Sequence, residues 1–404
     1  MTHCVITAVL LLMCASASAE TPALKGPLHT RGPAILDADD KPVRLGGVNW
    51  YGMEGEDFVP GGLHKIALPA LLDRIRTLGF NHVRLPLSVE LVMKNPKVTE
   101  HLEANPRLKG LTALQILDEI VAAAGRAGIG LLLDGHRLSA GWGDLGETDG
   151  LWKSAAWPEE KWIEAWLVLA RRYKGKGAVI GADLKNEPHG SVTWGSGDAE
   201  TDWRLAAERC GNAILKVAPE WLIFVEGTAI ALEGEGHHNY WWGGNLTHVK
   251  AAPVRLNVKG RLVYSPHEYG PGLGKPPWFK DAESMHRVWK KAWGYLLEEG
   301  QEWSTPVYLG EFGSSNGLRA GEPPADCFDD KGEFSQGRWL RSLFACLESS
   351  GASWSWWPLN GTMSDAAPAG RKFGDLEFYG VLSPDWEKPA SDVLMELFRK
   401  IQPR

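Results

Sequence analysis

The sequence predicts a single α/β domain folded as a (β/α)₈ barrel, also called a TIM barrel. Apolar runs typical of buried strands alternate with amphipathic helical segments along the chain, and eight such runs can be counted. Strands that alternate with helices indicate βαβ units and a parallel sheet. Eight units fit a closed barrel, and 404 residues suffice to build one. Residues 20–404 contain no low-complexity linker, so we expect them to form one domain.

A short hairpin is expected first, because Asp-Asp-Lys-Pro separates two short apolar segments within residues 34–45. We expect this hairpin to close the N-terminal end of the barrel. The eight barrel strands are then expected at 43–49, 82–86, 130–135, 179–185, 222–227, 262–267, 307–311 and 353–357. Helical patterns lie at 67–79, 112–128, 159–173, 202–217 and 335–351, with a last one just before the chain end. Several of them end at glycine, as helices often do.

The first 19 residues have the pattern of a secretory signal peptide. An apolar stretch over residues 5–13 leads to A-S-A at residues 17–19, which matches a signal-peptidase site. The stretch is too short to span a bilayer. Cys14 suggests a lipoprotein alternative, but the bulky Met13 before it disfavours lipidation. We therefore expect cleavage before Glu20 and a secreted or periplasmic protein without membrane attachment.

Composition narrows the class of partner. The formal net charge of -7 and the lack of a long basic run argue against nucleic acid. Twenty tryptophans are unusual, and Trp194, Trp241, Trp242 and Trp278 lie in loop-like stretches. Flat aromatic faces in loops suit the apolar faces of sugar rings. The spacing of the cysteines at 327 and 346 leaves open whether they pair.

Two glutamates, Glu187 and Glu311, carry most of the functional prediction. Each closes an apolar strand-like run, in VIGADLKNEPH and in PVYLGEFG. A carboxylate is costly to bury and is rarely placed there for packing alone. The active site of a (β/α)₈ barrel lies at the C-terminal ends of its strands. Two carboxylates that face each other across such a site can cleave a glycosidic bond.

Other strand ends carry polar or aromatic residues as well. Each one alone is more often a structural residue, but their coincidence at one end of the barrel favours a common site. The residues at these ends are Asn49, Trp50, Arg84, Asp134, His136, Asn186, Glu187, Glu226, His267, Tyr269, Glu311 and Trp357.

At these residues the chain resembles glycoside hydrolase family 5, a family of clan A retaining enzymes, and within it the bacterial endo-β-1,4-glucanases. The resemblance runs from about Gly32 to the C-terminus. Its motifs occur in family order as GVNWYG, NHVRLP, LLLDGHR, DLKNEPH, FVEG, YWWGGNL, SPHEYGP, LGEFG and SWSWWPLNG. The pair NEP and GEFG is the specific part, whereas HVRLP or DGHR alone would be weak.

The resemblance implies that Glu187 is the acid/base and Glu311 the nucleophile of a retaining hydrolysis of β-1,4-glucan. It implies further that no cofactor or metal is needed. The implied substrate-binding residues are Arg84 and Tyr269 on the nucleophile, Asn186 on the sugar 2-hydroxyl, His136 and His267 in the cleft, and Trp357 under a sugar ring. Asn49, Trp50 and Trp242 are expected to complete this site. We also expect a monomer.

The chemistry of a retaining enzyme sets two expectations for these carboxyls. They should lie about 5–5.5 Å apart, so that one attacks while the other protonates the leaving oxygen. Arg84 should hold Glu311 ionised, and Glu187, which has no evident cation, should have a raised pKa.

Two departures from the family pattern occur, Glu268 in place of the frequent aspartate and a longer loop after Trp357. We expect the Glu268 side chain to point away from the cleft.

Three alternatives remain beside this interpretation. A metal-dependent hydrolase could use Asp134, His136, Glu235 and the histidines at 237 and 238, although no strand carries a His-x-His pair. A carbohydrate-binding barrel without activity would be expected to have lost one of the two carboxylates. Another β-glycan, such as mannan or xyloglucan, is the nearest rival substrate.

Overall fold

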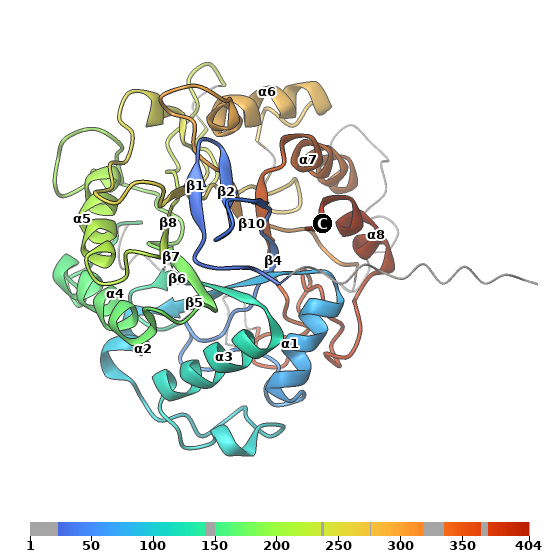
Figure 1. The fold of residues 1–404 in the computed structure, drawn as a ribbon. Coiled ribbons are helices and arrows are strands. Elements are labelled where there is room, and N and C mark those ends of the chain that lie inside the picture. Colours follow the sequence, from blue (N-terminus) through green and yellow to red (C-terminus); the bar gives the residue numbers. More distant parts are fainter. Residues whose placement is uncertain are drawn as a thin grey trace, which may run out of the picture.

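The eight-stranded parallel barrel predicted from the sequence is confirmed. The computed structural model describes residues 23–141, 150–235, 238–274, 276–317, 335–364 and 371–403. Within them eight strands form one sheet in the order β10-β11-β4-β5-β6-β7-β8-β9, and helices surround it (Figure 1). The strands are β4 (Gly46–Asn49), β5 (His82–Ser88), β6 (Gly130–Arg137), β7 (Val179–Asp183), β8 (Leu222–Val225), β9 (Leu262–Tyr264), β10 (Tyr308–Phe312) and β11 (Ser353–Trp356). Each overlaps a predicted strand.

The helices pack their apolar faces against the outside of the barrel. They are α1 (Leu68–Thr77), α2 (Val89–Lys94), α3 (Ala113–Ala127), α4 (Glu159–Tyr173), α5 (Trp203–Leu215), α6 (Ala282–Ala292), α7 (Gln336–Ser350) and α8 (Asp392–Ile401). The described residues also form three short 3-10 helices, η1 (Pro106–Leu108), η2 (Thr247–Lys250) and η3 (Gly294–Leu297). Helices α2 and α6 were not predicted. Thr112 and Gln115 form a capping box that fixes the start of α3.

The barrel closes between β9 and β10 through a sparse seam. Isolated bridges join Tyr264 to Val307 and His267 to Glu311. The amide of Glu268 also donates to the carbonyl of Glu311 at 3.0 Å. His267 and Glu311 therefore lie opposite each other at the C-terminal end of the seam.

The N-terminal end of the barrel is covered by a small antiparallel sheet, as predicted, although the sheet has a third strand. It consists of β1 (His29–Arg31), β2 (Ala34–Leu36) and β3 (Pro42–Val43), and β1 and β2 cross the barrel opening in Figure 1. Ile35 packs there in one buried cluster with Leu132, Phe224 and Tyr308 from three barrel strands. This apolar layer fills the closed end and leaves the other end for polar groups.

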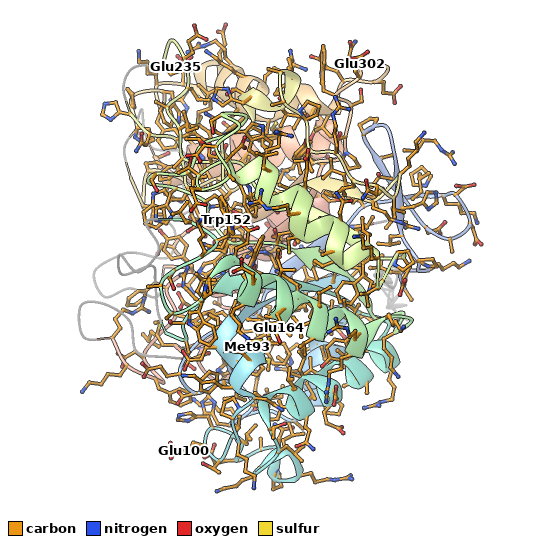
Figure 2. All side chains as sticks on the ribbon, turned by 90° about the vertical axis from the view of Figure 1, so that its left-hand side faces the viewer. Met93, Glu100, Trp152, Glu164, Glu235 and Glu302 are labelled. Atoms are coloured by element: carbon orange, nitrogen blue, oxygen red, sulfur yellow. The ribbon has the colours of Figure 1, made fainter. Side chains whose placement is uncertain are left out.

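Most tryptophans described by the structure belong to the core. Trp194 and Trp278, predicted to suit sugar rings, are 7% and 2% exposed, so that prediction is wrong for both. Trp152 lies near the edge of the barrel beside α4 (Figure 2), and its indole N–H donates to Glu159 Oε2 at 2.6 Å. None of the helices in the described residues has the length and apolar character needed to cross a membrane.

Candidate active site

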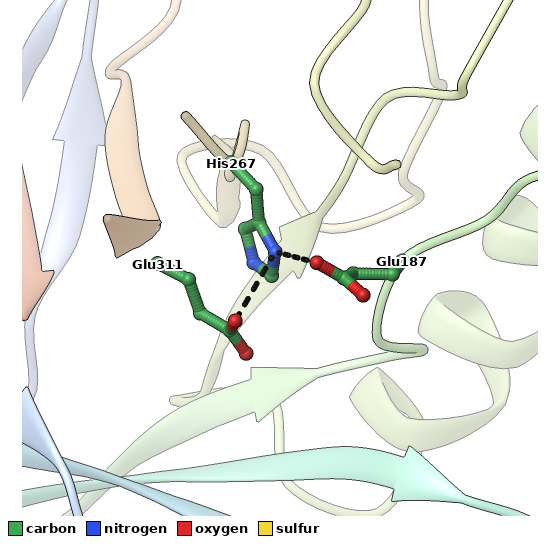
Figure 3. A group of neighbouring side chains, drawn as sticks. All are labelled: Glu187, His267 and Glu311. Carbon is green, nitrogen blue, oxygen red and sulfur yellow. Dashed lines mark hydrogen bonds and ion pairs between the residues drawn. The ribbon is translucent and has the colours of Figure 1, made fainter. Parts of the chain in front are cut away.

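Glu187, His267 and Glu311 converge at the C-terminal end of the barrel. Figure 3 shows the two carboxylates pointing toward the imidazole from opposite sides. His267 Nδ1 lies 3.1 Å from Glu187 Oε1 and 3.8 Å from Glu311 Oε2. One oxygen of each carboxylate and one ring nitrogen all lie within 4.8 Å of one another. An inverting enzyme needs its two carboxyl groups roughly 6.5–9.5 Å apart, so that a water molecule fits beside the sugar. The spacing of Glu187 and Glu311 is too short for that arrangement.

The guanidinium of Arg84 binds the carboxylate of Glu311. That guanidinium is completely buried, and Nη1 donates to Glu311 Oε1 at 2.8 Å. Tyr269 donates from its hydroxyl to the other oxygen, Glu311 Oε2, at 2.9 Å. Both oxygens of Glu311 are therefore bound by donors, which fixes the orientation of the carboxylate. The strand register contributes to this arrangement, because Arg84 on β5 is the paired neighbour of Asn49 on β4.

Arg84 also binds three buried acids, of which Asp134 and Glu226 were among the predicted strand-end residues and Asp183 was not. Its guanidinium lies 3.0 Å from Asp134 Oδ1, 2.9 Å from Asp183 Oδ2 and 3.1 Å from Glu226 Oε1. All three carboxylates have no exposed surface. Asp134 and Glu226 were visible as strand-end acids, but only the fold shows that they share one cation. Asp183 lies inside an apolar run of the sequence. A charged residue in such a run indicates a buried partner of opposite charge, and this signal could have identified Asp183.

Two residues predicted to bind substrate are structural instead. Trp50 has no exposed surface, packs in the core and donates its indole N–H to the carbonyl of Gly61 at 2.8 Å. Asn49 is also completely buried, accepts a hydrogen bond from Arg84 and donates to the carbonyl of Gly310. Asn49 therefore positions Arg84. A position at the end of a strand did not distinguish a side chain at the rim of the barrel from one directed into the barrel wall.

Trp357 lies at the rim with His136 and Tyr51. Its ring is 5.4 Å from His136 with an interplanar angle of 6°, and 5.3 Å from Tyr51 with an angle of 15°. Trp357 keeps partial exposure, whereas Trp354 and Trp356 are completely buried. His136 Nδ1 is hydrogen-bonded to Asp134 Oδ2 at 2.6 Å, which fixes the imidazole plane. The three rings form one stacked group, of which Trp357 is the most exposed member, because Tyr51 has no exposed surface and His136 is buried.

Trp242 provides a second aromatic face near Glu187. Its side chain is 45% exposed, and its ring stacks on His189 at 3.6 Å and 6°. His189 in turn contacts the carbonyl of Glu187 through Nδ1 at 2.6 Å. Asn186, one residue before Glu187, accepts a hydrogen bond from Arg84 Nη2 at 3.1 Å.

The pKa directions of the two glutamates differ from those predicted. Burial alone would raise the pKa of Glu187, but the hydrogen bond and positive charge of His267 outweigh it and lower the pKa to about 2. Burial, together with the charge of Glu187, raises the pKa of Glu311 despite His267 and Arg84. The sequence analysis placed His267 in the cleft but did not identify it as a cation beside Glu187. Burial would lower the pKa of His267, but Glu226, Glu311 and Glu187 raise it well above its ordinary value.

One histidine and two carboxylates also have the composition of a metal site. Here Arg84 and Tyr269 already occupy the oxygens of Glu311, and a positively charged His267 has no lone pair for a metal. The ligands proposed for the metal-dependent alternative form no group of three within the described residues. Glu235 instead faces Arg287 at 3.6 Å. These donors fit a network of proton-sharing groups better than a metal centre.

Both departures from the family pattern can be located. Glu268 points away from Glu187 and Glu311, because its Oε1 accepts hydrogen bonds from Tyr240 and from Trp293 Nε1. In the loop after Trp357, the carboxylate of Glu377 accepts a hydrogen bond from Tyr51 at 2.7 Å. The loop therefore holds Tyr51, the ring that stacks on Trp357. The pairing of Cys346 with the cysteine at 327 lies outside the described residues, as does the predicted signal peptide.

Comparisons with known proteins agree with this site. The model of the cellulase family, glycosyl hydrolase family 5, matches residues 36–362. An endoglucanase of Paenibacillus polymyxa is 37% identical over 391 residues, covering 95% of this chain and 90% of the relative. The major extracellular endoglucanase of Xanthomonas campestris is 33% identical, covering 89% of this chain and 68% of that protein.

Solved structures give the same family. The hyperthermophilic endocellulase of Pyrococcus horikoshii has a TM-score of 0.77 and 35% identity, covering 93% of this chain and 98% of the other. The catalytic domain of the Xanthomonas campestris endoglucanase has a TM-score of 0.76 and 32% identity, with 93% and 99% covered. With a matching family model, two relatives above 30% identity and the same barrel, the chain belongs to glycosyl hydrolase family 5.

Proposed function

We propose that this glycoside hydrolase is a retaining endo-β-1,4-glucanase that acts on cellulose or a related β-glucan. The observation that carries the proposal is the approach of Glu187 and Glu311 to within 4.8 Å at the open end of the barrel. The relatives named endoglucanases support the endo-acting glucanase assignment. Endocellulase complexes with cellotetraose among the similar structures support a β-1,4-linked glucan as the ligand class.

Glu311 is the nucleophile in this proposal. Arg84 and Tyr269 hold its two oxygens, so little reorganisation is needed when one of them attacks the anomeric carbon. The bond from that carbon to the leaving sugar oxygen breaks as the carboxylate bond forms. The product of this step is a covalent glycosyl-enzyme, which water then hydrolyses.

Glu187 is the acid/base. It delivers a proton to the leaving oxygen in the first step and accepts one from the attacking water in the second. The proton is available although the pKa of Glu187 is low, because His267 Nδ1 lies 3.1 Å from Glu187 Oε1. Transfer along that hydrogen bond converts ionised Glu187 beside charged His267 into neutral Glu187 beside neutral His267. The two forms contain the same number of protons.

The remaining residues bind and orient the glucan. We propose that Asn186, next to Glu187, binds the 2-hydroxyl of the sugar ring whose bond is cut, and that His136 hydrogen-bonds the same ring. Trp357 offers its face to that ring, and Trp242 offers a second face on the far side of Glu187. The stacked neighbours of both indoles, His136 and His189, keep these faces in place.

The substrate can be tested directly. We expect reducing ends to be released from soluble β-1,4-glucan and mixed-linkage β-glucan faster than from mannan, xylan or xyloglucan. An endo-acting enzyme should also lower the viscosity of the polymer before many ends appear. Glu311→Gln is the matched control, because it retains the shape of the site without a nucleophile. Faster release from mannan or xyloglucan would replace the glucanase proposal with the rival substrate.

The stereochemistry gives an independent test. Proton NMR of the first sugar released should show the β-anomer before mutarotation mixes the anomers. An initial α-anomer would mean inversion, which needs carboxylates roughly 6.5–9.5 Å apart.

We also propose that the protein is exported and acts as a monomer with one catalytic domain, residues 20–404, after removal of residues 1–19. The signal-like sequence supports export, as does the name of the extracellular Xanthomonas relative. Determination of the N-terminal residue and of the mass of the mature protein would test both statements.

A further inference from the structure

Glu226 is a buried carboxylate beside the acid/base that the mechanism above leaves without a task. It directly follows β8 and has no exposed surface. Its Oε2 accepts a hydrogen bond from the amide of Glu187 at 2.7 Å. Its Oε1 lies 3.1 Å from His267 Nε2 and 3.1 Å from Arg84 Nη2. One side chain thus contacts the backbone of the acid/base and the far side of its imidazole partner.

The backbone of Glu187 requires such a contact. Its φ of 54° is in the left-handed region, which non-glycine residues seldom adopt without support. Gly243 encloses the same carboxylate, because a Cβ at this position would lie 2.0 Å from Glu226 Oε2. The amide of Gly243 donates to the carbonyl of Pro188 at 3.3 Å. Glu226 is therefore held between the backbone of the acid/base and the loop that carries Trp242.

The position of Glu226 also decides which nitrogen of His267 carries hydrogen. Arg84 and the amide of Glu187 both favour an ionised, accepting Glu226. An ionised Glu226 oxygen at 3.1 Å favours a hydrogen atom on the nitrogen that faces it, Nε2. Nδ1, on the other side of the ring, is left to share the second proton with Glu187 Oε1. That proton is the one the leaving sugar needs.

We infer that Glu226 is a positioning residue, which fixes the protonated nitrogen of His267 and thereby keeps the catalytic proton in the Glu187–His267 hydrogen bond. The inference rests on the acid/base role proposed for Glu187. In the first step the shared proton leaves with the sugar oxygen, and in the second step the attacking water returns one. Glu226 changes neither its bonds nor its contacts in this cycle.

Burial and charge act on Glu226 and His267 in opposite directions. Burial raises the pKa of Glu226, whereas the positive charges of His267 and Arg84 lower it, and the nearby carboxylates raise the pKa of His267. The three groups that contact the oxygens of Glu226, which are His267, Arg84 and the amide of Glu187, favour its carboxylate form. The charged groups on the barrel strands that face Glu226 and His267 are Arg84, Asp134, Asp183 and Glu311, from β5, β6, β7 and β10.

Glu226→Gln tests the inference, because glutamine keeps the size of the side chain but not its charge. Without that negative charge His267 holds its proton more weakly, so the shared proton is lost at lower pH. We expect the basic limb of the kcat/KM profile on cello-oligosaccharides to move down by about one pH unit. At the pH optimum the loss should be roughly tenfold or more on these substrates and smaller on aryl glycosides, which need little proton assistance.

Glu268→Gln is the matched control. Glu268 is also buried and follows His267 directly, but its carboxylate contacts Tyr240 and Trp293. This variant should retain the wild-type basic limb and the wild-type dependence on the leaving group. A folded Glu226→Gln variant that loses activity equally at all pH values and on both substrate types would make Glu226 merely structural and overturn the inference.

A measurement on the wild-type protein keeps the inference testable if Glu226→Gln does not fold. In ¹⁵N-histidine-labelled enzyme, His267 Nε2 should show the chemical shift of a protonated nitrogen throughout the active pH range, while Nδ1 changes. An unprotonated Nε2 at the pH optimum would contradict the inference. Parallel assays of the wild type on glucan and of Glu187→Ala on aryl glycosides show separately whether the proposed function itself fails.

Discussion

Arg84 and Glu311 form a buried ion pair in which the guanidinium binds only one of the two carboxylate oxygens, at 2.8 Å, while Tyr269 binds the other. The same guanidinium contacts Asp134, Asp183 and Glu226. One cation therefore serves the nucleophile and the acids that support the acid/base. Loss of its geometry should affect stability and catalysis together.

Arg84→Lys should damage both properties. An ammonium group has a compact charge and cannot reach all four carboxylates through a planar fork. Breaking a buried ion-pair network costs roughly 3–5 kcal/mol, so we expect a marked fall in unfolding free energy and in kcat. Arg172→Lys is the control, since its pair with Asp118 is part-exposed and worth about 1 kcal/mol or less. Chemical denaturation and kinetics of both variants check this, and a fully active, stable Arg84→Lys protein would contradict it.

Glu187→Ala should distinguish between leaving groups. Removal of the general acid slows departure of a sugar by roughly 10²–10⁴-fold, but departure of a good aryl leaving group needs little proton assistance. Rates on cello-oligosaccharides and on dinitrophenyl glycosides measure this difference. Added azide should restore turnover of the aryl substrate, since a small anion can replace water once the base is missing. Equal damage to both substrates would remove Glu187 from the acid/base role.

Trp357→Ala should weaken catalysis more than folding. The indole is at the rim and partly exposed, so little core is lost when it is removed. We expect a loss of turnover or binding on cello-oligosaccharides with a small change in melting temperature. Trp354→Ala is the comparison, because that indole is completely buried and its loss should cost roughly 3–5 kcal/mol of stability. A large fall in the melting temperature of Trp357→Ala with near-normal kinetics would show a core role instead.

His82 should make the protein sensitive to acid. Burial lowers the pKa of His82 to about 3, whereas an unfolded chain has a histidine pKa of about 6.5. Between these values only the unfolded state binds the proton, so stability is present above the upper value and is lost as pH falls. The loss is about 1.4 kcal/mol per pH unit. His82→Gln should show a shallower decline in unfolding free energy from pH 6.5 to 4.5, whereas the exposed control His248→Gln should follow the wild type.

The sequence predicted the eight barrel strands because each is an apolar run that the alternation with helices places in order. It missed α2, which has only six residues and begins directly after β5 at Ser88. It also missed α6, although the buried residues Met285, Val288, Trp289 and Ala292 have the i, i+3, i+4, i+7 spacing of an amphipathic helix. Hydrophobic periodicity cannot identify a helix as short as α2, but it could have identified α6.

The site was predictable where a residue type at a strand end carries its own chemistry, as for Glu187 and Glu311. It was not predictable where a role depends on a partner. Trp50 has the same position along its strand as a rim residue, but its indole turns into the core. The pKa directions depended on His267, which follows β9 and reaches Glu187, after β7, past the end of the intervening strand β8.

That seam has a consequence for heat tolerance. The pairs from β10 through β4 to β9 are ladders of three or more paired residues, whereas β9 and β10 meet in the described residues through two isolated bridges and three backbone hydrogen bonds. Local opening is easiest where few backbone hydrogen bonds must break. Such an opening parts His267 from Glu311 while the rest of the barrel stays intact. The enzyme should therefore lose its reaction centre reversibly on warming, some degrees before its secondary structure melts.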